Sequence, residues 1–314
     1  MFAMGIQNPK FYGTKKEKPA KPFLKYRKIC FALSLAAIAA GFVFMGINKS
    51  STGDILNYSM EFKGGTSTNV TFNEEMSQER IESEVVPLVE EITGDADVQT
   101  QRVSGSNEVI IKTRTLNMEE REAFEKAMED SFGVEKEKIT AESISGAVSQ
   151  EMKQDAFVAV VIATICMLIY IWFRFKNIRF AASSVLALIH DVLVVIACYA
   201  AFKWPVGSTF IACILTIVGY SINATIVIFD RVRENLKEKR HDQTIEENVN
   251  LSITQTFTRS VNTSLTTFVM VLVLYIMGVS SIREFALPLM VGIVCGTYSS
   301  VCLAGSLWFE MNRR

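Results

Sequence analysis

The chain has 314 residues, of which 49% are hydrophobic, and its mean hydropathy is +0.25. Soluble domains of this size rarely reach such a value, so the composition favours several membrane spans over a soluble enzyme. The net charge of -1 is unevenly distributed, because residues 1–28 are basic and residues 51–152 are acidic. The six cysteines form no C-x-x-C pair or Cys/His ligand spacing, so we expect small buried apolar thiols, no metal and no cofactor.

Residues 1–28 are interpreted as a basic cytoplasmic tail, and the first apolar segment follows at 29–48. This segment has a longer leader and core than a signal peptide, so we expect an uncleaved anchor. Five more apolar segments follow at 153–173, 178–199, 207–229, 260–280 and 284–308. Each approaches the ~20 residues that a helix needs to cross ~30 Å of hydrocarbon. The sequence therefore predicts six transmembrane helices.

The orientation is predicted from lysines and arginines in short connections, which favour the cytoplasmic side. Basic residues follow the second span (Arg174, Lys176 and Arg179), follow the fourth span (within 231–240) and end the chain at Arg313-Arg314. We therefore expect cytoplasmic termini, with 230–259 as a cytoplasmic loop and 309–314 as a cytoplasmic C-terminus. Residues 49–152 would then form one domain on the outer side.

The 49–152 segment carries strand and helix patterns in alternation. Strands are expected at 57–72, 97–103, 108–114 and 138–145, and helices at 76–92 and 116–132, with a turn at 104–107. Ser77 and Asn117 are the expected N-caps. The β-α-β-β-α-β order predicts a ferredoxin-like α+β fold. Its scattered carboxylates are typical of solvated helix faces, and no catalytic set is apparent.

Two adjacent glycines stand out in the Phe62-Lys63-Gly64-Gly65-Thr66 segment. Glycine permits positive φ and close backbone approach. No G-K-[ST] follows, and no strand–loop–helix frame is evident, so a structural turn is favoured over a phosphate-binding loop.

Ionisable residues within the apolar spans are few. His190-Asp191 in the third span lies 12 residues beyond Arg179, roughly 18 Å along a helix and so near mid-membrane. The fourth span contains Asn223, and the fifth opens with Arg259, followed by Thr263 and Thr266 on one stripe. Because these two spans run in opposite directions, we expect Asp191, Asn223 and Arg259 to meet inside the bundle.

Two interpretations of these polar residues remain open. A titrating carboxylate beside a fixed guanidinium would form a two-state switch in a cation pathway. Hydrogen bonding between helices would instead make them interhelical contacts. The pathway is favoured for Asp191 and Arg259 because membrane charges are costly, whereas Asn223 and the threonines fit both. His190 is interpreted as a polar neighbour of Asp191.

Two further patterns concern packing and anchoring. The sixth span repeats small residues at every fourth position (Gly292, Gly296, Ser300 and Ala304), which favours close helix packing. The Asp230-Arg231-Val232-Arg233-Glu234-Asn235 run follows the fourth span. It is interpreted as a positive-inside anchor, with a partner-docking surface as the alternative.

Several of these segments resemble the SecD/SecF family of the resistance-nodulation-division superfamily. The family elements F-x-G-G-T, A-x-x-H-D, G-Y-S-[IL]-N, D-R-[IV]-R-E-N and G-T-x-S-S resemble residues 62–66, 187–191, 219–223, 230–235 and 296–300. Residues 252–256 and Arg259 are similar to the start of the family's fifth span. These motifs occur in the family's order from about residue 29 to residue 308, so the resemblance leaves out only the basic tail. The motif of the fourth span begins at Gly219.

The resemblance implies a multi-pass protein of the bacterial inner membrane that pairs with SecD and hydrolyses no nucleotide. Its implied partners are the SecYEG channel, YajC, YidC, the unfolded secretory substrate and membrane lipids, with no nucleic acid. The implied activity is use of a proton or sodium gradient to promote protein export, and we expect no enzymatic reaction.

The sequence departs from the family at one position. Where the family commonly has an aspartate after the asparagine of G-Y-S-[IL]-N, this chain has Ala224. We hypothesise that Arg259 keeps one half of the switch while SecD supplies the carboxylate, with Asp191 as a second candidate. A non-coupling scaffold and half of a solute or lipid exporter are the alternatives, although exporters usually carry larger outer domains.

Overall fold

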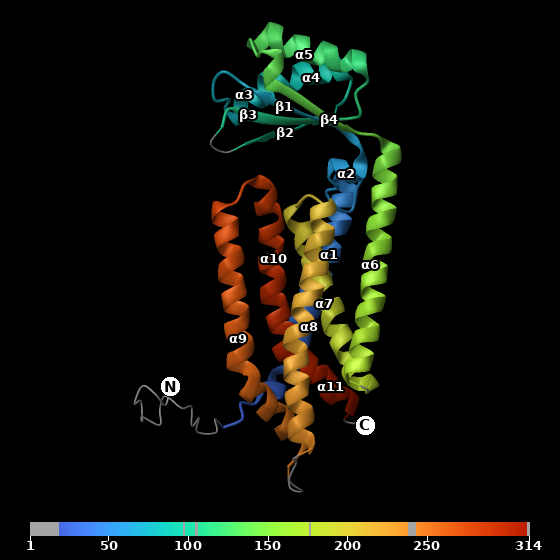
Figure 1. The fold of residues 1–314 in the computed structure, drawn as a ribbon, viewed down its shortest axis with the longest axis vertical. Coiled ribbons are helices and arrows are strands. Elements are labelled where there is room, and N and C mark those ends of the chain that lie inside the picture. Colours follow the sequence, from blue (N-terminus) through green and yellow to red (C-terminus); the bar gives the residue numbers. More distant parts are fainter. Residues whose placement is uncertain (1–18, 97, 104–105, 176, 238–242, 313–314) are drawn as a thin grey trace, which may run out of the picture.

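The computed structural model describes residues 19–96, 98–103, 106–175, 177–237 and 243–312. A long helical bundle carries a small α+β domain at one end (Figure 1). Six helices in the described part are long and apolar enough to cross a membrane, as predicted. They are α1 (Arg27–Thr52), α6 (Gly146–Phe175), α7 (Ile178–Phe202), α8 (Ser208–Lys237), α9 (Ile245–Met277) and a last helix that begins as α10 (Ser280–Tyr298). The last helix continues through a π-helical stretch, η6 (Ser299–Ala304), into α11 (Gly305–Asn312).

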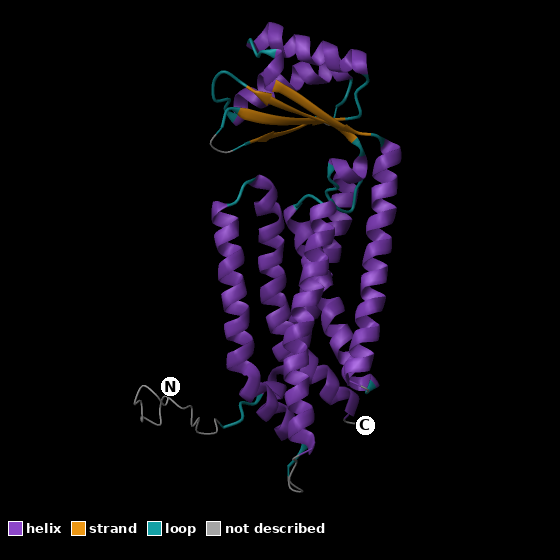
Figure 2. Ribbon diagram, viewed as in Figure 1, coloured by secondary structure: helices purple, strands orange, loops and turns teal. Residues whose placement is uncertain are grey.

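The α+β domain contains a four-stranded antiparallel sheet in the order β2-β3-β1-β4 (Figure 2). The strands are β1 (Gly65–Thr71), β2 (Gln99–Arg102), β3 (Glu108–Thr113) and β4 (Ile139–Ile144). Helices cover the sheet face that is turned away from the bundle: α3 (Gln78–Arg80), the π-helical η4 (Ile81–Val85), α4 (Val86–Thr93) and α5 (Met118–Phe132). Alternate residues of the central strands, such as Val70 and Ile111, pack beneath these helices against Phe124 and Met128.

The expected N-caps form in the structure. The Ser77 hydroxyl accepts from the Arg80 amide at 3.3 Å, and the Asn117 side chain accepts from the Glu120 amide at 2.8 Å. Glu120 in turn accepts from the Asn117 amide, which completes a capping box at the start of α5. Of the expected turn at 104–107, positions 104 and 105 lie outside the described residues.

The expected strand at 57–72 is wrong in its first half. A short helix, α2 (Met60–Lys63), takes that place, and the strand begins only at Gly65. The cause is packing against the bundle: Phe62 is buried in the cluster that contains Val195 and Tyr199. The Glu61 carboxylate also accepts from the Ser208 amide at 2.5 Å, at the start of α8.

The Gly64-Gly65 pair forms the structural turn between α2 and β1. Both residues have positive φ, at 79° and 140°. A Cβ atom at Gly65 would lie 2.5 Å from the Thr113 carbonyl oxygen, so a side chain cannot be accommodated there without a shift. Thr66 follows as a buried residue whose hydroxyl accepts from the Leu116 amide at 2.9 Å.

The long cytoplasmic loop expected at 230–259 is not observed. α8 continues to Lys237 and α9 starts at Ile245 with a Thr244/Glu247 capping box, while residues 238–242 lie outside the described part. Because this stretch is polar, hydropathy did not predict that the two helices extend beyond their apolar segments.

The described part of the predicted basic tail packs on the bundle. Leu24 is fully buried and its amide donates to Asn250 Oδ1 at 3.0 Å, while Arg27 pairs with Glu310 at 2.7 Å. Leu24 lies in a short 3-10 helix, η3 (Phe23–Tyr26), and Arg27 is the first residue of α1. Residues 1–18 of the predicted tail lie outside the described residues.

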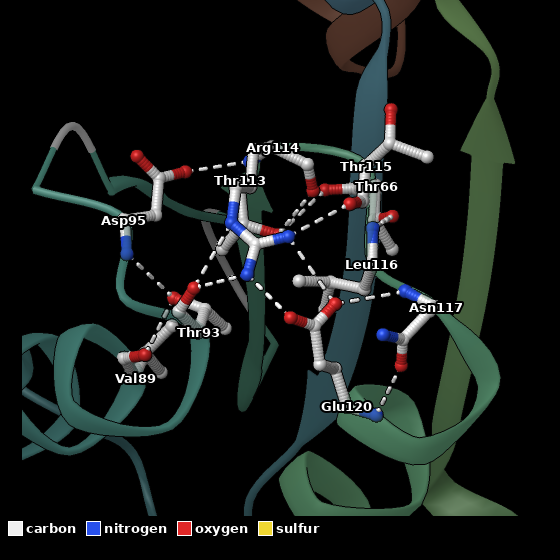
Figure 3. Close-up of polar contacts among 10 residues, drawn as sticks. All are labelled: Thr66, Val89, Thr93, Asp95, Thr113, Arg114, Thr115, Leu116, Asn117 and Glu120. Carbon is white, nitrogen blue, oxygen red and sulfur yellow. Dashed lines mark hydrogen bonds and ion pairs between the residues drawn. The ribbon is translucent and has the colours of Figure 1, made fainter.

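Arg114 links α4, β3 and α5 in the α+β domain (Figure 3). Its guanidinium pairs with Glu120 and donates from Nε to the Thr93 carbonyl at 3.0 Å. The hydrogen bond from the Arg114 guanidinium to the Glu120 carboxylate, followed by the one from the Asn117 amide, lowers the pKa of Glu120. Glu120 therefore contributes stability that is fully present above the pKa of an unfolded glutamate, ~4.3, and is lost as the pH falls through its lower folded pKa.

We expect Glu120→Gln to reduce the loss of domain stability on acidification from pH 7 to pH 3. Glutamine cannot provide the charge whose protonation is linked to unfolding. The measurement is the thermal midpoint of the domain's circular dichroism signal across that pH range. Glu119→Gln, at the neighbouring exposed position of α5, is the control and should follow the wild type. An unchanged pH dependence in Glu120→Gln would contradict the assignment.

Candidate functional site in the membrane helices

Asp191 lies at a junction of three helices and is fully buried. Its Oδ2 accepts from the Ser221 hydroxyl of α8 at 2.5 Å and from the Ser299 hydroxyl of η6 at 2.7 Å. Its Oδ1 lies 3.0 Å from His190 Nδ1 and accepts from the Cys295 thiol of α10 at 3.3 Å. The carboxylate is therefore surrounded by polar groups of this chain.

Small residues allow this close approach of α8 and the last helix. A Cβ atom at Gly296 would lie 3.1 Å from Ser221 Cβ, and one at Gly292 would lie 2.3 Å from Ile217. The predicted role of this stripe in close packing is therefore supported by the geometry. The π-helical stretch begins at Ser299, and such stretches reposition side chains, often at functional sites.

Arg259 lies elsewhere, in a cavity of about 120 Å³ between α8 and α9. Asn223 and Ala224 line the cavity from α8, and Ser260 and Thr263 line it from α9. Arg259 is exposed, and within the described residues no carboxylate comes within 4.0 Å of its guanidinium. The buried Ser260 hydroxyl also has no hydrogen-bond partner among those residues.

The structure thus corrects the expectation that Asp191, Asn223 and Arg259 meet. Asn223 and Arg259 line one cavity, but Asp191 bonds to the other side of α8 through Ser221. Two positions that are two residues apart on an α-helix are separated by roughly 200° around the helix axis. The side chains of Ser221 and Asn223 therefore point in opposite directions. Helical periodicity places positions 221 and 223 on different faces, but only the structure shows that Asp191 faces Ser221.

The predicted threonine stripe is bonded to its own helix. The Thr263 hydroxyl donates to the Arg259 carbonyl at 2.9 Å, and the Thr266 hydroxyl donates to the Thr263 carbonyl at 2.9 Å. Both threonines are exposed, and only Thr263 lines the Arg259 cavity. These local bonds satisfy the hydroxyls without a neighbouring helix.

Residues 230–235 hold the ends of three helices together. Asp230 pairs with Arg174 of α6, while Arg233 lies 4.0 Å from Asp230 and donates to the Arg174 carbonyl at 3.5 Å. Glu234 accepts from Arg231 at 2.5 Å within α8. Part of this motif's charge is therefore engaged within the chain.

The same motif contacts α9 through amide groups. Asn235 Nδ2 donates to Ser252 Oγ at 2.8 Å and to Gln255 Oε1 at 2.9 Å. Arg231 Nε donates to the same Gln255 oxygen at 2.6 Å. Gln255 belongs to the 252–256 run singled out from the sequence, so two sequence motifs form one contact.

The cysteines differ from the expectation that all six are buried. Cys213 and Cys295 are buried, Cys166 is exposed on α6, and Cys30, Cys198 and Cys302 are intermediate. The exposed position follows from α6 itself, because most of its apolar stretch is not covered by the rest of this chain. Sequence reasoning missed the role of Cys295 beside Asp191, because a lone cysteine in an apolar span carries no motif.

The matching family model is described as "Protein export membrane protein SecD/SecF, C-terminal", and it covers residues 123–314. The chain belongs to the SecD/SecF family. It is 37% identical to the protein translocase subunit SecF of Sebaldella termitidis, over 82% of each chain. It is 34% identical to SecF of Gemmatimonas aurantiaca, covering 96% of this chain and 89% of that relative.

Family members of the SecDF type are much longer. The protein translocase subunit SecDF of Bacillus subtilis is 34% identical over 95% of this chain, but only 40% of the relative is covered. The crystal structure of SecDF, a translocon-associated membrane protein from Thermus thermophilus, superposes with a TM-score of 0.80 at 31% identity. That match covers 96% of this chain and 40% of the SecDF chain. With its six apolar helices, this SecD/SecF family member is a multi-pass protein of the bacterial membrane.

Proposed function

We propose that the chain is an accessory subunit of the Sec protein translocase, works with a SecD partner and uses a cation gradient to promote export. The SecF relatives align over most of their length, which supports the subunit role. The SecDF chains extend well beyond the matched 40%, which supports a SecD partner. The proposal assigns the chain no enzymatic reaction.

The proposal includes an outer ferredoxin-like domain and cytoplasmic termini. The antiparallel order β2-β3-β1-β4, with helices on one face, supports the ferredoxin-like assignment. The described N-terminal residues and α11 lie at the end of the bundle opposite the sheet (Figure 1). Arg174, Arg179 and Arg231 are at that same end, as the positive-inside rule requires for a cytoplasmic face.

The observation that carries the coupling proposal is the exposed Arg259 in its small polar cavity. A guanidinium in the membrane is costly without a counter-charge, and Ala224 supplies none. Asp191 is already bonded on the far side of α8. A carboxylate from a membrane helix of SecD would complete the pair and would make cation binding sensitive to contact between the subunits.

SecYEG, YajC, YidC and an unfolded secretory protein complete the proposed surroundings, together with membrane lipids. A non-coupling scaffold is the second candidate function, and the specific observation in its favour is Ala224 at the cavity wall. The two functions differ in whether Arg259 matters when a gradient is present.

We expect Arg259→Ala to reduce gradient-stimulated export at least about tenfold, equivalent to ~1.4 kcal/mol of barrier. The assay is export of a secretory precursor into inverted vesicles that contain this chain and its SecD, with and without an ion gradient. Arg283→Ala is the matched control, because Arg283 is also an exposed arginine but lies in the first turns of α10, beyond the C-terminal end of α9. Equal gradient stimulation in wild type and Arg259→Ala would favour the scaffold.

A further inference from the structure

His190, Asp191 and Cys295 bring three metal-ligating atoms together between α7 and α10. His190 Nδ1 and Asp191 Oδ1 are 3.0 Å apart, Cys295 Sγ and Asp191 Oδ1 are 3.3 Å apart, and Sγ and Nδ1 are 3.9 Å apart. The three residues are 9%, 0% and 8% exposed. They lie on the opposite side of α8 from the Arg259 cavity, so the cluster is separate from the proposed coupling site.

The triangle has the size of one face of a tetrahedral zinc site. Zinc binds histidine nitrogen and carboxylate oxygen at about 2.0–2.2 Å and thiolate sulfur at about 2.3 Å, so ligand atoms in a tetrahedron lie roughly 3.3–3.6 Å apart. The three separations bracket that range. Small shifts of the side chains would therefore place all three atoms around one ion.

The surroundings of Asp191 favour this use of its Oδ1 atom. The hydroxyls of Ser221 and Ser299 donate to Oδ2 from two different helices. They fix the plane of the carboxylate and leave Oδ1 directed at the imidazole and the thiol. Such hydrogen bonds to the non-ligating atom of a carboxylate are the usual support of a metal ligand.

The charge and access of the site favour a divalent ion. One carboxylate and one thiolate carry two negative charges, which neutralise a divalent cation where isolated charges are costly. A mixed sulfur, nitrogen and oxygen set suits Zn²⁺ better than Ca²⁺ or Mg²⁺, which prefer oxygen. His190 and Cys295 also line a largely apolar groove of about 500 Å³, in which Ser34 and Tyr298 carry the hydroxyl groups, so the open side of the three ligands has room for a fourth.

We propose that His190 Nδ1, Asp191 Oδ1 and Cys295 Sγ form a zinc-binding site that ties α7 to α10. Binding displaces the thiol proton, and the proton that Nδ1 donates to Asp191 Oδ1 in the metal-free protein moves to Nε2, so that the Nδ1 lone pair can ligate the ion. The sequence offered no zinc spacing, because His190 and Cys295 are 105 positions apart. The proposal does not depend on the role of the chain in export.

The test uses the purified full chain in detergent micelles, stripped of metal with a chelator. Co²⁺ is the spectroscopic probe, and Zn²⁺ affinity is measured by competition with a chromophoric chelator. We expect one equivalent of Co²⁺, a thiolate-to-cobalt charge-transfer band in the near ultraviolet, and displacement of that band by Zn²⁺. Cys295→Ser should abolish the band and weaken Zn²⁺ binding at least about 100-fold, since even supporting residues contribute 10–100-fold.

Cys213→Ser is the matched control, because Cys213 is also buried but lies in a separate apolar cluster. It should keep the band and the affinity. The proposal is overturned if wild type shows no thiolate band, if Cys295→Ser binds Zn²⁺ like wild type, or if Cys213→Ser loses the band equally. Should Cys295→Ser not fold, the wild-type spectrum together with His190→Gln, which should also lose tight binding, decides the question.

Discussion

Asp191→Ala is expected to destabilise the membrane bundle by about 3–5 kcal/mol, because it leaves several buried donors without an acceptor. The hydroxyls of Ser221 and Ser299 and the thiol of Cys295 all donate to this carboxylate. No water is present in hydrocarbon to replace it. Thermal unfolding in detergent, followed by tryptophan fluorescence in the presence of a chelator, measures the change without any contribution from metal.

Two variants separate this effect from a general loss of charge. Asp155→Ala removes an exposed carboxylate on α6 and should change stability by no more than about 0.5 kcal/mol. Asp191→Asn keeps one acceptor oxygen and should lose less than Asp191→Ala. A wild-type unfolding temperature for Asp191→Ala would mean that the three-helix junction does not depend on this carboxylate.

The helices of the bundle were predictable because a single physical requirement dominates them. Each span needs a long apolar run, and all six runs are visible in the sequence. The ends were less predictable: α6 starts at Gly146 and α9 at Ile245, well before their apolar cores. Polar residues extend these helices beyond the membrane, where hydropathy gives no signal and capping residues such as Thr244 determine the boundary.

The α+β domain was predictable where local rules and tertiary packing agree. The caps at Ser77 and Asn117 follow from local pattern, and so does the order of helices and strands along the chain. The segment around Phe62 looks like a strand by its alternation, but this side chain is buried against the membrane helices and the backbone forms α2 instead. Alternation alone does not say which of two cores a side chain enters.

The candidate site was only half predictable. Sequence singled out Asp191 and Arg259, since charges in apolar spans are rare. It did not separate them onto two sides of α8, and it missed Ser221, Ser299 and Cys295 as neighbours of Asp191. The π-helical stretch that begins at Ser299 has no simple sequence signature, so the register of the last helix at this point needs the structure.

Ala224→Asp is expected to restore gradient-stimulated export, at least about tenfold, in vesicles whose SecD has lost the carboxylate that we propose pairs with Arg259. Ala224 and Arg259 line the same cavity, so the substitution adds a carboxylate to the cavity that the Arg259 guanidinium lines, within one chain. A charge pair about 4 Å apart is worth on the order of 4 kcal/mol at an effective dielectric constant of 20, enough to favour pairing. The measurement is precursor export into inverted vesicles with and without the gradient.

Ala224→Asn is the matched control, because it has nearly the same shape as the aspartate variant and carries no charge. It should not restore export, since an amide cannot alternate between a neutral and a negative state. With an intact SecD, Ala224→Asp should give no gain, because two carboxylates would then compete for one guanidinium. If Ala224→Asp fails to restore export, and removal of the SecD carboxylate alone has no effect either, then Arg259 is not half of a shared switch. Its cavity would then be a polar contact between α8 and α9, and the scaffold function would account for the chain.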